Sequence, residues 1–156
     1  MLNRRLCVTG ITLLLCAPTF AADPTGAIEW SAQDFQGLAK TLATKMDETK
    51  SGAQPLLTKP THSALVFHRE GTGEAEIHER FADFLVVRSG EGVFQVGGKI
   101  GGTHNIAKDE IRGKTLDGGT RYKVTAGDVL YIPANVPHRT LVEAGKQLNV
   151  LVIKVQ

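Results

Sequence analysis

The strongest constraint on this chain is the alternation of apolar and polar residues from residue 61 onward, in short runs separated by Gly, Pro or Asn. Successive side chains of a strand point to opposite faces, whereas an amphipathic helix repeats every three or four residues. The 17 glycines and the aromatic content of 6% also suit short strands and tight turns. We therefore predict an all-β sandwich or barrel. Strands are predicted at residues 64–69, 75–79, 84–88, 92–96, 121–125, 128–132, 139–143 and 148–155.

One long interruption of the alternation spans residues 97–119, which are rich in glycine and charge. The segment is too long for a plain turn, and loops of this length in compact domains are commonly binding loops or lids. Two other interpretations stay open: a surface excursion without a binding role, and a short hairpin formed by residues 110–112 and 114–116.

A helical pattern precedes the strands. Ser31 supplies a hydroxyl cap and Asp34 an acid in the first turn, which predicts a helix that runs to about Asp47. Its apolar residues recur three and four positions apart, and they are Phe35, Leu38, Leu42 and Met46. We expect this face to pack on the outside of the barrel. Breakers follow the helix, so residues 22–60 are interpreted as helix and linker, and residues 61–156 as the barrel domain.

The first residues have the pattern of a secretory signal peptide. Arg4 and Arg5 precede an apolar run at residues 6–17, and Ala21 supplies the small residue before a cleavage site. A membrane anchor is the alternative, but the run is short for a bilayer. We predict that residues 1–21 are removed and that the protein is exported, either to the periplasm or out of the cell.

Removal of this leader changes the charge and the redox chemistry of the chain. Loss of Arg4 and Arg5 lowers the 18 basic residues to 16, equal to the 16 acidic residues. We therefore expect neither nucleic acid nor, without the leader, a membrane as a partner. Cys7 and Cys16 both lie in the leader, so the mature domain has no thiol for a disulfide or for catalysis. Lipid attachment at Cys16 is disfavoured because Leu15, which is not a small residue, precedes it.

Glu76 and His78 are the first residues that suggest chemistry. They lie two positions apart in a predicted strand, so both side chains leave the same face. A carboxylate beside an imidazole makes a pair of metal ligands, although on a solvated strand the same two groups form a plain ion pair. The remaining histidines near the strands, among them His68, are interpreted as structural or solvated.

The surroundings of this pair resemble the first motif of the cupin superfamily, Gly-x5-His-x-His-x4-Glu-x6-Gly. Here the sequence reads Glu76-x-His78-x4-Asp83-x6-Gly90, with Glu76 in place of the first histidine and Asp83 in place of the glutamate. The upstream glycine is displaced by one position. Asp83 is one methylene shorter than Glu, so we expect it either to bind a metal weakly or to support a ligand histidine.

The second cupin motif, Gly-x5-Pro-x-Gly-x2-His-x3-Asn, resembles the sequence Gly127-x5-Pro133-x-Asn135-x2-His138. Asn135 replaces a glycine, and Asn tolerates the left-handed backbone conformation that such a turn requires. Val142 replaces the final asparagine and removes a polar group.

The resemblance covers residues 71–142 and implies a cupin-type double-stranded β-helix, or jelly-roll barrel, with one N-terminal helix packed outside. In cupins that bind metal, the motif residues cluster inside one end of the barrel. By this resemblance the metal ligands would be Glu76, His78, Asp83 and His138. Such a set suits a divalent transition metal, namely iron, manganese, nickel or zinc.

Three hypotheses about function follow. The first is a metal-dependent enzyme, of the oxygenase or isomerase type, that acts on a small organic molecule. The second is a non-catalytic protein that binds a small molecule in the same barrel mouth. The third is a structural or interaction barrel without metal, dimeric through its strand edges. Bound metal separates the first hypothesis from the other two.

Overall fold

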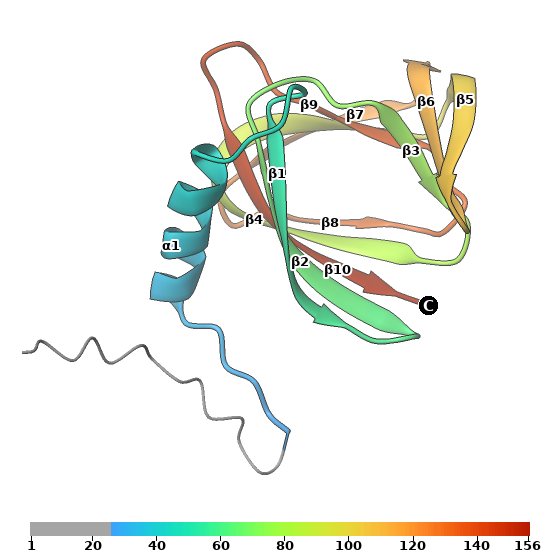
Figure 1. Cartoon of the computed structure of the whole chain (residues 1–156). Helices are drawn as coiled ribbons and strands as arrows, with labels where there is room; N and C mark the ends of the chain where they lie inside the picture. Colours follow the sequence, from blue (N-terminus) through green and yellow to red (C-terminus); the bar gives the residue numbers. More distant parts are fainter. Residues whose placement is uncertain (1–25) are drawn as a thin grey trace, which may run out of the picture.

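A computed structural model describes residues 26–156 (Figure 1). The predicted leader, its cleavage site after Ala21 and both cysteines lie outside the described residues. Within residues 26–156 no helix is long and apolar enough to cross a membrane. The elements of this part of the chain are α1 (Ala32–Ala43), β1 (Ser51–Thr58), β2 (His62–Arg69), β3 (Ala75–His78), β4 (Ala82–Val96), β5 (Lys99–Ala107), β6 (Glu110–Asp117), β7 (Thr120–Thr125), β8 (Val129–Ile132), β9 (His138–Leu141) and β10 (Leu148–Val155).

The strands form an antiparallel sheet that curls on itself, as Figure 1 shows. Neighbouring strands follow the order β1-β2-β10-β4-β9-β3-β6-β5, and β7 and β8 also pair with β4. The first part of β4 pairs with β8 and β10, and its second part pairs with β7 and β9. One strand therefore belongs to both halves of the curl. This arrangement confirms the predicted all-β barrel.

The strands predicted at 84–88 and 92–96 are a single strand, and Gly90 lies where β4 passes from one half of the curl to the other. Gly90 has a φ of 81°, a conformation that disfavours any side chain. A Cβ at this position would lie 1.9 Å from the carbonyl oxygen of Gln147. A glycine that the sequence suggests as a strand boundary is thus the point at which a continuous strand turns.

The core fills the inside of the curl with alternate residues of β4 and β10 and with single residues from the neighbouring strands. It consists of Leu85, Val87, Phe94, Val124, Ile132, Val142, Leu148, Val150 and Val152. Val142, which stands where the cupin motif has an asparagine, is 4% exposed. Hydrophobic packing thus takes the place of the polar group that this substitution removes.

The predicted helix is confirmed at its start and in its packing. Ser31 and Asp34 form a reciprocal capping box: the Asp34 N–H donates to Ser31 Oγ, and the Ser31 N–H donates to the Asp34 carboxylate. α1 packs on β1 and β2, outside the curl (Figure 1). Leu42 is buried there, and a Cβ on Gly52 would lie 3.3 Å from its Cδ2 atom.

The helix ends at Ala43, earlier than the predicted end near Asp47. The Asp47 carboxylate explains the difference, because it accepts hydrogen bonds from the N–H groups of Thr49 and Ser51. A side chain that binds the backbone two and four residues ahead stabilises a turn in place of a further helical turn. This turn reverses the chain into β1.

The interpretation of residues up to 60 as a linker is corrected by β1, which pairs with β2 along its length. Pro55 disfavoured a strand prediction for these residues, because proline has no backbone N–H to donate. β1 lies at one edge of the sheet order, where a missing donor is tolerated, and its register shifts between Pro55 and Leu57.

The long loop predicted at 97–119 is also corrected. Most of this segment is the β5–β6 hairpin, whose strands pair with a register shift between Asn105 and Ala107. Asp109, in the turn, has a φ of 63°, a left-handed conformation that Asp adopts more readily than most residues. The sequence left open a short hairpin formed by residues 110–112 and 114–116. These residues instead belong to one strand, β6, which forms a longer hairpin with β5.

Candidate metal centre

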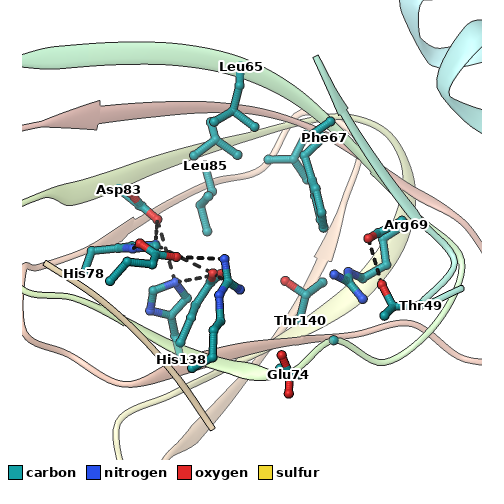
Figure 2. A pocket seen from close by; sticks show the side chains of 18 of the residues that line it. Thr49, Leu65, Phe67, Arg69, Glu74, His78, Asp83, Leu85, His138 and Thr140 are labelled. Atoms are coloured by element: carbon teal, nitrogen blue, oxygen red, sulfur yellow. Dashed lines mark hydrogen bonds and ion pairs between the residues drawn. The ribbon is translucent and has the colours of Figure 1, made fainter. Parts of the chain in front are cut away.

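A cavity of about 450 Å³ lies inside the curl (Figure 2). Much of its wall is apolar and comes from β2, β4 and β10, including Leu65, Phe67, Leu85 and Phe94. His78, His138 and Asp83 gather on one side of it. The predicted site residues thus lie at a cavity of the size that binds small molecules.

β3 and β9 bring three of the predicted ligands together. Glu76 and His78 point to the same face of β3, and Glu76 is the cross-strand partner of His138. His78 Nε2 lies 3.9 Å from Glu76 Oε2, and His138 Nε2 lies 3.3 Å from Glu76 Oε1. Ligand atoms of all three residues lie within 4.8 Å of one another. Residues 60 positions apart in the sequence are therefore neighbours around one point.

The second nitrogen of each imidazole is held by an acceptor. His138 Nδ1 donates to the Val136 carbonyl oxygen over 3.0 Å, and His78 Nδ1 contacts the Glu110 carboxylate over 2.5 Å. Acceptors at Nδ1 leave Nε2 of each ring facing a carboxylate: Glu76 is nearest to that of His138, and Asp83 is nearest to that of His78. His78 Nε2 is buried and makes no hydrogen bond among the described residues. Metal-binding histidines typically have this arrangement, in which an acceptor fixes one nitrogen and leaves the other for the ion.

Asn135 connects the second motif to the first. Its φ of 63° confirms the predicted left-handed conformation, and its N–H donates to the His78 carbonyl oxygen over 2.9 Å. The turn that precedes β9 is thereby tied to the end of β3.

Asp83 lies next to both imidazoles but already has a cation partner. Its Oδ2 atom is 3.2 Å from His78 Nε2 and 3.7 Å from His138 Nε2. Lys154, its cross-strand partner on β10, donates to both carboxylate oxygens over 2.9 and 3.1 Å. The 3.2 Å contact with His78 is an ion pair without hydrogen-bond geometry. Asp83 is therefore placed to support the histidines more than to bind an ion itself.

Sequence reasoning missed the role of three charged neighbours of the site. Glu110 and Arg112 are the cross-strand partners of His78 and Glu76, and Arg112 forms ion pairs with both Glu76 and Glu110. Glu110 and Arg112 lie two positions apart, which places both side chains on one face of a strand. The sequence contained no signal that this strand pairs with β3. Lys154 lies among apolar residues in the last predicted strand, and the sequence did not indicate that it belongs to the site.

The charges of the cluster shift the pKa values of its members. Burial alone would raise the pKa of the Glu76 carboxyl, but the contact with His138 and the charge of Arg112 hold it well below its usual range. Burial would lower the pKa of His78, yet Asp83 and Glu110 raise it to about 9. For Asp83 the effect of burial is outweighed by His78 and Lys154, which lower the pKa of its carboxyl. The site therefore stabilises positive charge.

The donor set fits a divalent transition metal. Two donor atoms bound at about 2.1 Å to one ion lie at most about 4.2 Å apart. The two histidine Nε2 atoms lie 3.9 and 3.3 Å from different oxygens of Glu76, and the three ligand atoms together lie within 4.8 Å, so small side-chain rotations would bring them around one ion. Two imidazole nitrogens and a carboxylate oxygen are ligands for iron, manganese, nickel or zinc. The unsatisfied Nε2 of His78 gives such an ion a position to occupy.

The other histidines take no part in this cluster. His68 is fully buried outside the cavity, where its imidazole contacts Asn149 Oδ1 at 2.9 Å and Glu70 Oε1 at 3.1 Å. The structural role expected for it is thereby confirmed. His62 and His104 are exposed on strands, His104 on the hairpin that the sequence suggested as a loop.

Comparison with known proteins identifies the fold. No family model and no curated protein matches the sequence. A conserved protein with a double-stranded β-helix domain from Klebsiella pneumoniae matches with a TM-score of 0.55 at 13% identity, over 83% of this chain and 90% of that one. The polyketide cyclase RemF from Streptomyces resistomycificus matches with a TM-score of 0.50 at 17% identity, over 68% of this chain and 65% of that one. The DMSP lyase DddQ from Ruegeria pomeroyi matches with a TM-score of 0.51 at 14% identity, over 69% of this chain and 47% of that one.

The chain thus spans less than two thirds of the cyclase and about half of the lyase. At sequence identities this low, the structural likeness shows the fold alone, and the chain has the double-stranded β-helix fold. Together with the two sequence motifs, this fold makes it a barrel of the cupin type.

Proposed function

We propose that the protein is a metal-dependent enzyme that acts on a small organic molecule and binds a divalent transition metal through Glu76, His78 and His138. The observation that carries this proposal is the orientation of the two imidazoles, each with Nδ1 on an acceptor and Nε2 within 3.9 Å of a Glu76 carboxylate oxygen. When bound, the metal would act as a Lewis acid toward an oxygen of the substrate.

The remaining residues of the site would prepare this centre. Glu110 holds the His78 ring and also binds Arg112, so that its own position is fixed. Asp83, held by Lys154, adds negative charge beside both imidazoles and would help to hold them in position. An apolar substrate body packed against the apolar part of the cavity wall would lower the local dielectric and strengthen these electrostatic contacts.

The structural neighbours support a role in small-molecule chemistry. A polyketide cyclase and a DMSP lyase share this type of barrel, and both are enzymes by name. The fold accommodates different reactions, so the chemistry of this protein follows from its own site. A cavity of about 450 Å³ suits a substrate of modest size.

The alternative is a barrel that binds a small molecule without metal. One observation favours it: Arg112 and Lys154 already provide cations to Glu76 and Asp83. A site whose carboxylates are neutralised by the protein retains its structure without an ion. Metal content therefore decides between the two functions.

The test is metal retention by purified protein reloaded with iron, manganese, nickel and zinc in turn and then desalted. Elemental analysis should find about one ion per chain in the wild type and almost none in His78→Ala or His138→Ala. Glu76→Gln should retain less metal, and Asp83→Asn should keep a measurable amount. His62→Ala, which changes an exposed histidine, is the matched control. If the wild type keeps none of the four metals, the binding barrel replaces the enzyme.

A further inference from the structure

Arg69, at the end of β2, places a buried positive charge beside the cavity. The residue is 8% exposed and lines the cavity, and Figure 2 shows it across from His78 and Asp83. Its Nε and Nη1 atoms have no hydrogen-bond partner, and the side chain makes no ion pair with any residue in 26–156. In contrast, Arg112 in the same cavity binds two carboxylates. Arg69 is therefore a buried cation that makes no direct ion pair, although the more distant charges of Glu76 and Asp47 act on it.

The protein holds this guanidinium in place by packing. It lies over the Phe67 ring, with Cζ 5.0 Å from the ring centroid. On another side the Gly73 backbone approaches so closely that a Cβ there would lie 2.9 Å from Cζ. Gly73 is itself fixed, because its N–H donates to the Thr140 carbonyl oxygen. The guanidinium is thus positioned in advance, and an unpaired buried charge of this kind favours binding of an anion.

The cavity between Arg69 and the metal centre determines which anion fits. Its wall there is apolar, with Leu65, Phe67, Leu85 and Phe94 among the residues that form it. A ligand that reaches from Arg69 to His138 would therefore need an apolar body. Its charged end would meet a single planar guanidinium, which matches the two oxygens of a carboxylate.

The charges around the cavity favour a monoanion over a phosphate. Several carboxylates line the same space: Asp47, Glu74, Glu76, Asp83 and Glu110. Arg112 and Lys154 are already engaged with three of them. A doubly charged phosphate would meet this negative potential with only Arg69 to compensate, whereas one carboxylate matches one guanidinium.

We propose that the cavity binds a small organic monocarboxylate with an apolar body, whose carboxylate lies on Arg69 and whose other end reaches the metal centre. The position of the second end rests on the proposed function. The position of the carboxylate does not, since Arg69 is not a proposed metal ligand and forms no ion pair with one.

Calorimetric titration of metal-free protein with hexanoate tests the proposal. Hexanamide has the same shape as hexanoate without the charge. Inorganic phosphate tests whether the site prefers a phosphate to a carboxylate. Wild-type protein should bind hexanoate at least tenfold more tightly than either hexanamide or phosphate. Arg69→Met should abolish this preference, and Arg69→Lys should retain part of it because it keeps the charge but loses the planar fork. Arg88→Met is the matched control, because Arg88 is exposed and lies over Phe35 outside the cavity.

Thermal melts of the same variants separate binding from folding. Removing an unpaired buried charge should leave the melting temperature of Arg69→Met equal to or above that of the wild type. Hexanoate should raise the melting temperature of the wild type and leave that of Arg69→Met unchanged. A lower melting temperature for Arg69→Met would show that the guanidinium is a structural group and would overturn the proposal.

The outcomes also distinguish this proposal from the proposed function. If metal is retained but hexanoate preference survives Arg69→Met, the carboxylate site is wrong and the metal centre stands. If no metal is retained but the Arg69-dependent preference persists, the carboxylate site stands without an enzyme. Tighter, Arg69-dependent binding of phosphate than of hexanoate would overturn the choice of a carboxylate.

Discussion

At the scale of single residues, Asn135 has both a conformational and a positional role. Its left-handed backbone ties the turn before His138 to the carbonyl oxygen of His78. We predict that Asn135→Gly melts close to the wild-type temperature, whereas Asn135→Val is destabilised by about 1–2 kcal/mol because a β-branched side chain resists positive φ. Thermal melts measure both. Equal melting temperatures for the two variants would contradict this account of the turn.

Glu110 is the residue whose effect on the metal should be largest without direct contact. Its carboxylate holds Nδ1 of His78, so Glu110→Gln should leave the fold intact and weaken metal affinity by about 10–100-fold. Glu79→Gln, which changes an exposed carboxylate directly after β3, is the control and should have no effect. Competition with a chelator gives both affinities. Unchanged affinity in Glu110→Gln would show that the carboxylate does not orient the imidazole of a metal ligand.

The residues of the site differ in how far the sequence predicts them. Glu76 and His78 are two apart in a strand, and this spacing alone places them on one face. Their proximity to His138 followed from the resemblance to cupin motifs, and the cross-strand pair of Glu76 and His138 confirms it. Glu110 and Arg69 could not be found in this way. Their positions depend on which strands pair and in which register, and a local pattern of apolar and polar residues does not contain that information.

At the scale of elements, α1 depends on its capping box. We predict that Ser31→Ala lowers the free energy of unfolding by about 1 kcal/mol, because the Asp34 N–H loses its acceptor and the Asp34 carboxylate loses a donor. Ser31→Thr should restore most of this stability, since it keeps the hydroxyl that accepts from the Asp34 N–H and donates to the Asp34 carboxylate. Urea unfolding measures the difference. A loss in Ser31→Ala that Ser31→Thr does not restore would contradict a capping role.

The elements that the sequence missed have a common cause. β1 contains Pro55, and the β5–β6 hairpin contains several glycines, so both carry residues that disfavour strands locally. β1 and β5 lie at the two ends of the sheet order, where a strand pairs on one side only, and β6 joins β5 to β3. Tertiary pairing outweighs the weak local preference of these strands. The strands with regular alternation were predicted close to their observed positions, except that those predicted at 84–88 and 92–96 form the single strand β4.

At the scale of the whole molecule, the expected product of export is a chain that begins at Ala22. The order of basic residues, apolar run and small residue at Ala21 gives this expectation. Intact-mass measurement of protein recovered from the periplasm or medium should show the loss of residues 1–21. A mass that retains them would contradict cleavage, and a lipid adduct on Cys16 would identify a lipoprotein instead.

The place of β10 in the sheet also governs how quickly the chain can fold. β10 comes after every other strand in the sequence, yet it lies between β2 and β4. Its Asn149 contacts His68 across 81 residues, and its Lys154 contacts Asp83 across 71. Contacts between such distant residues require large loops to close first, so we expect folding over milliseconds to seconds. Because Lys154 also lines the cavity, we expect the binding site to be complete only once β10 has paired with β2 and β4.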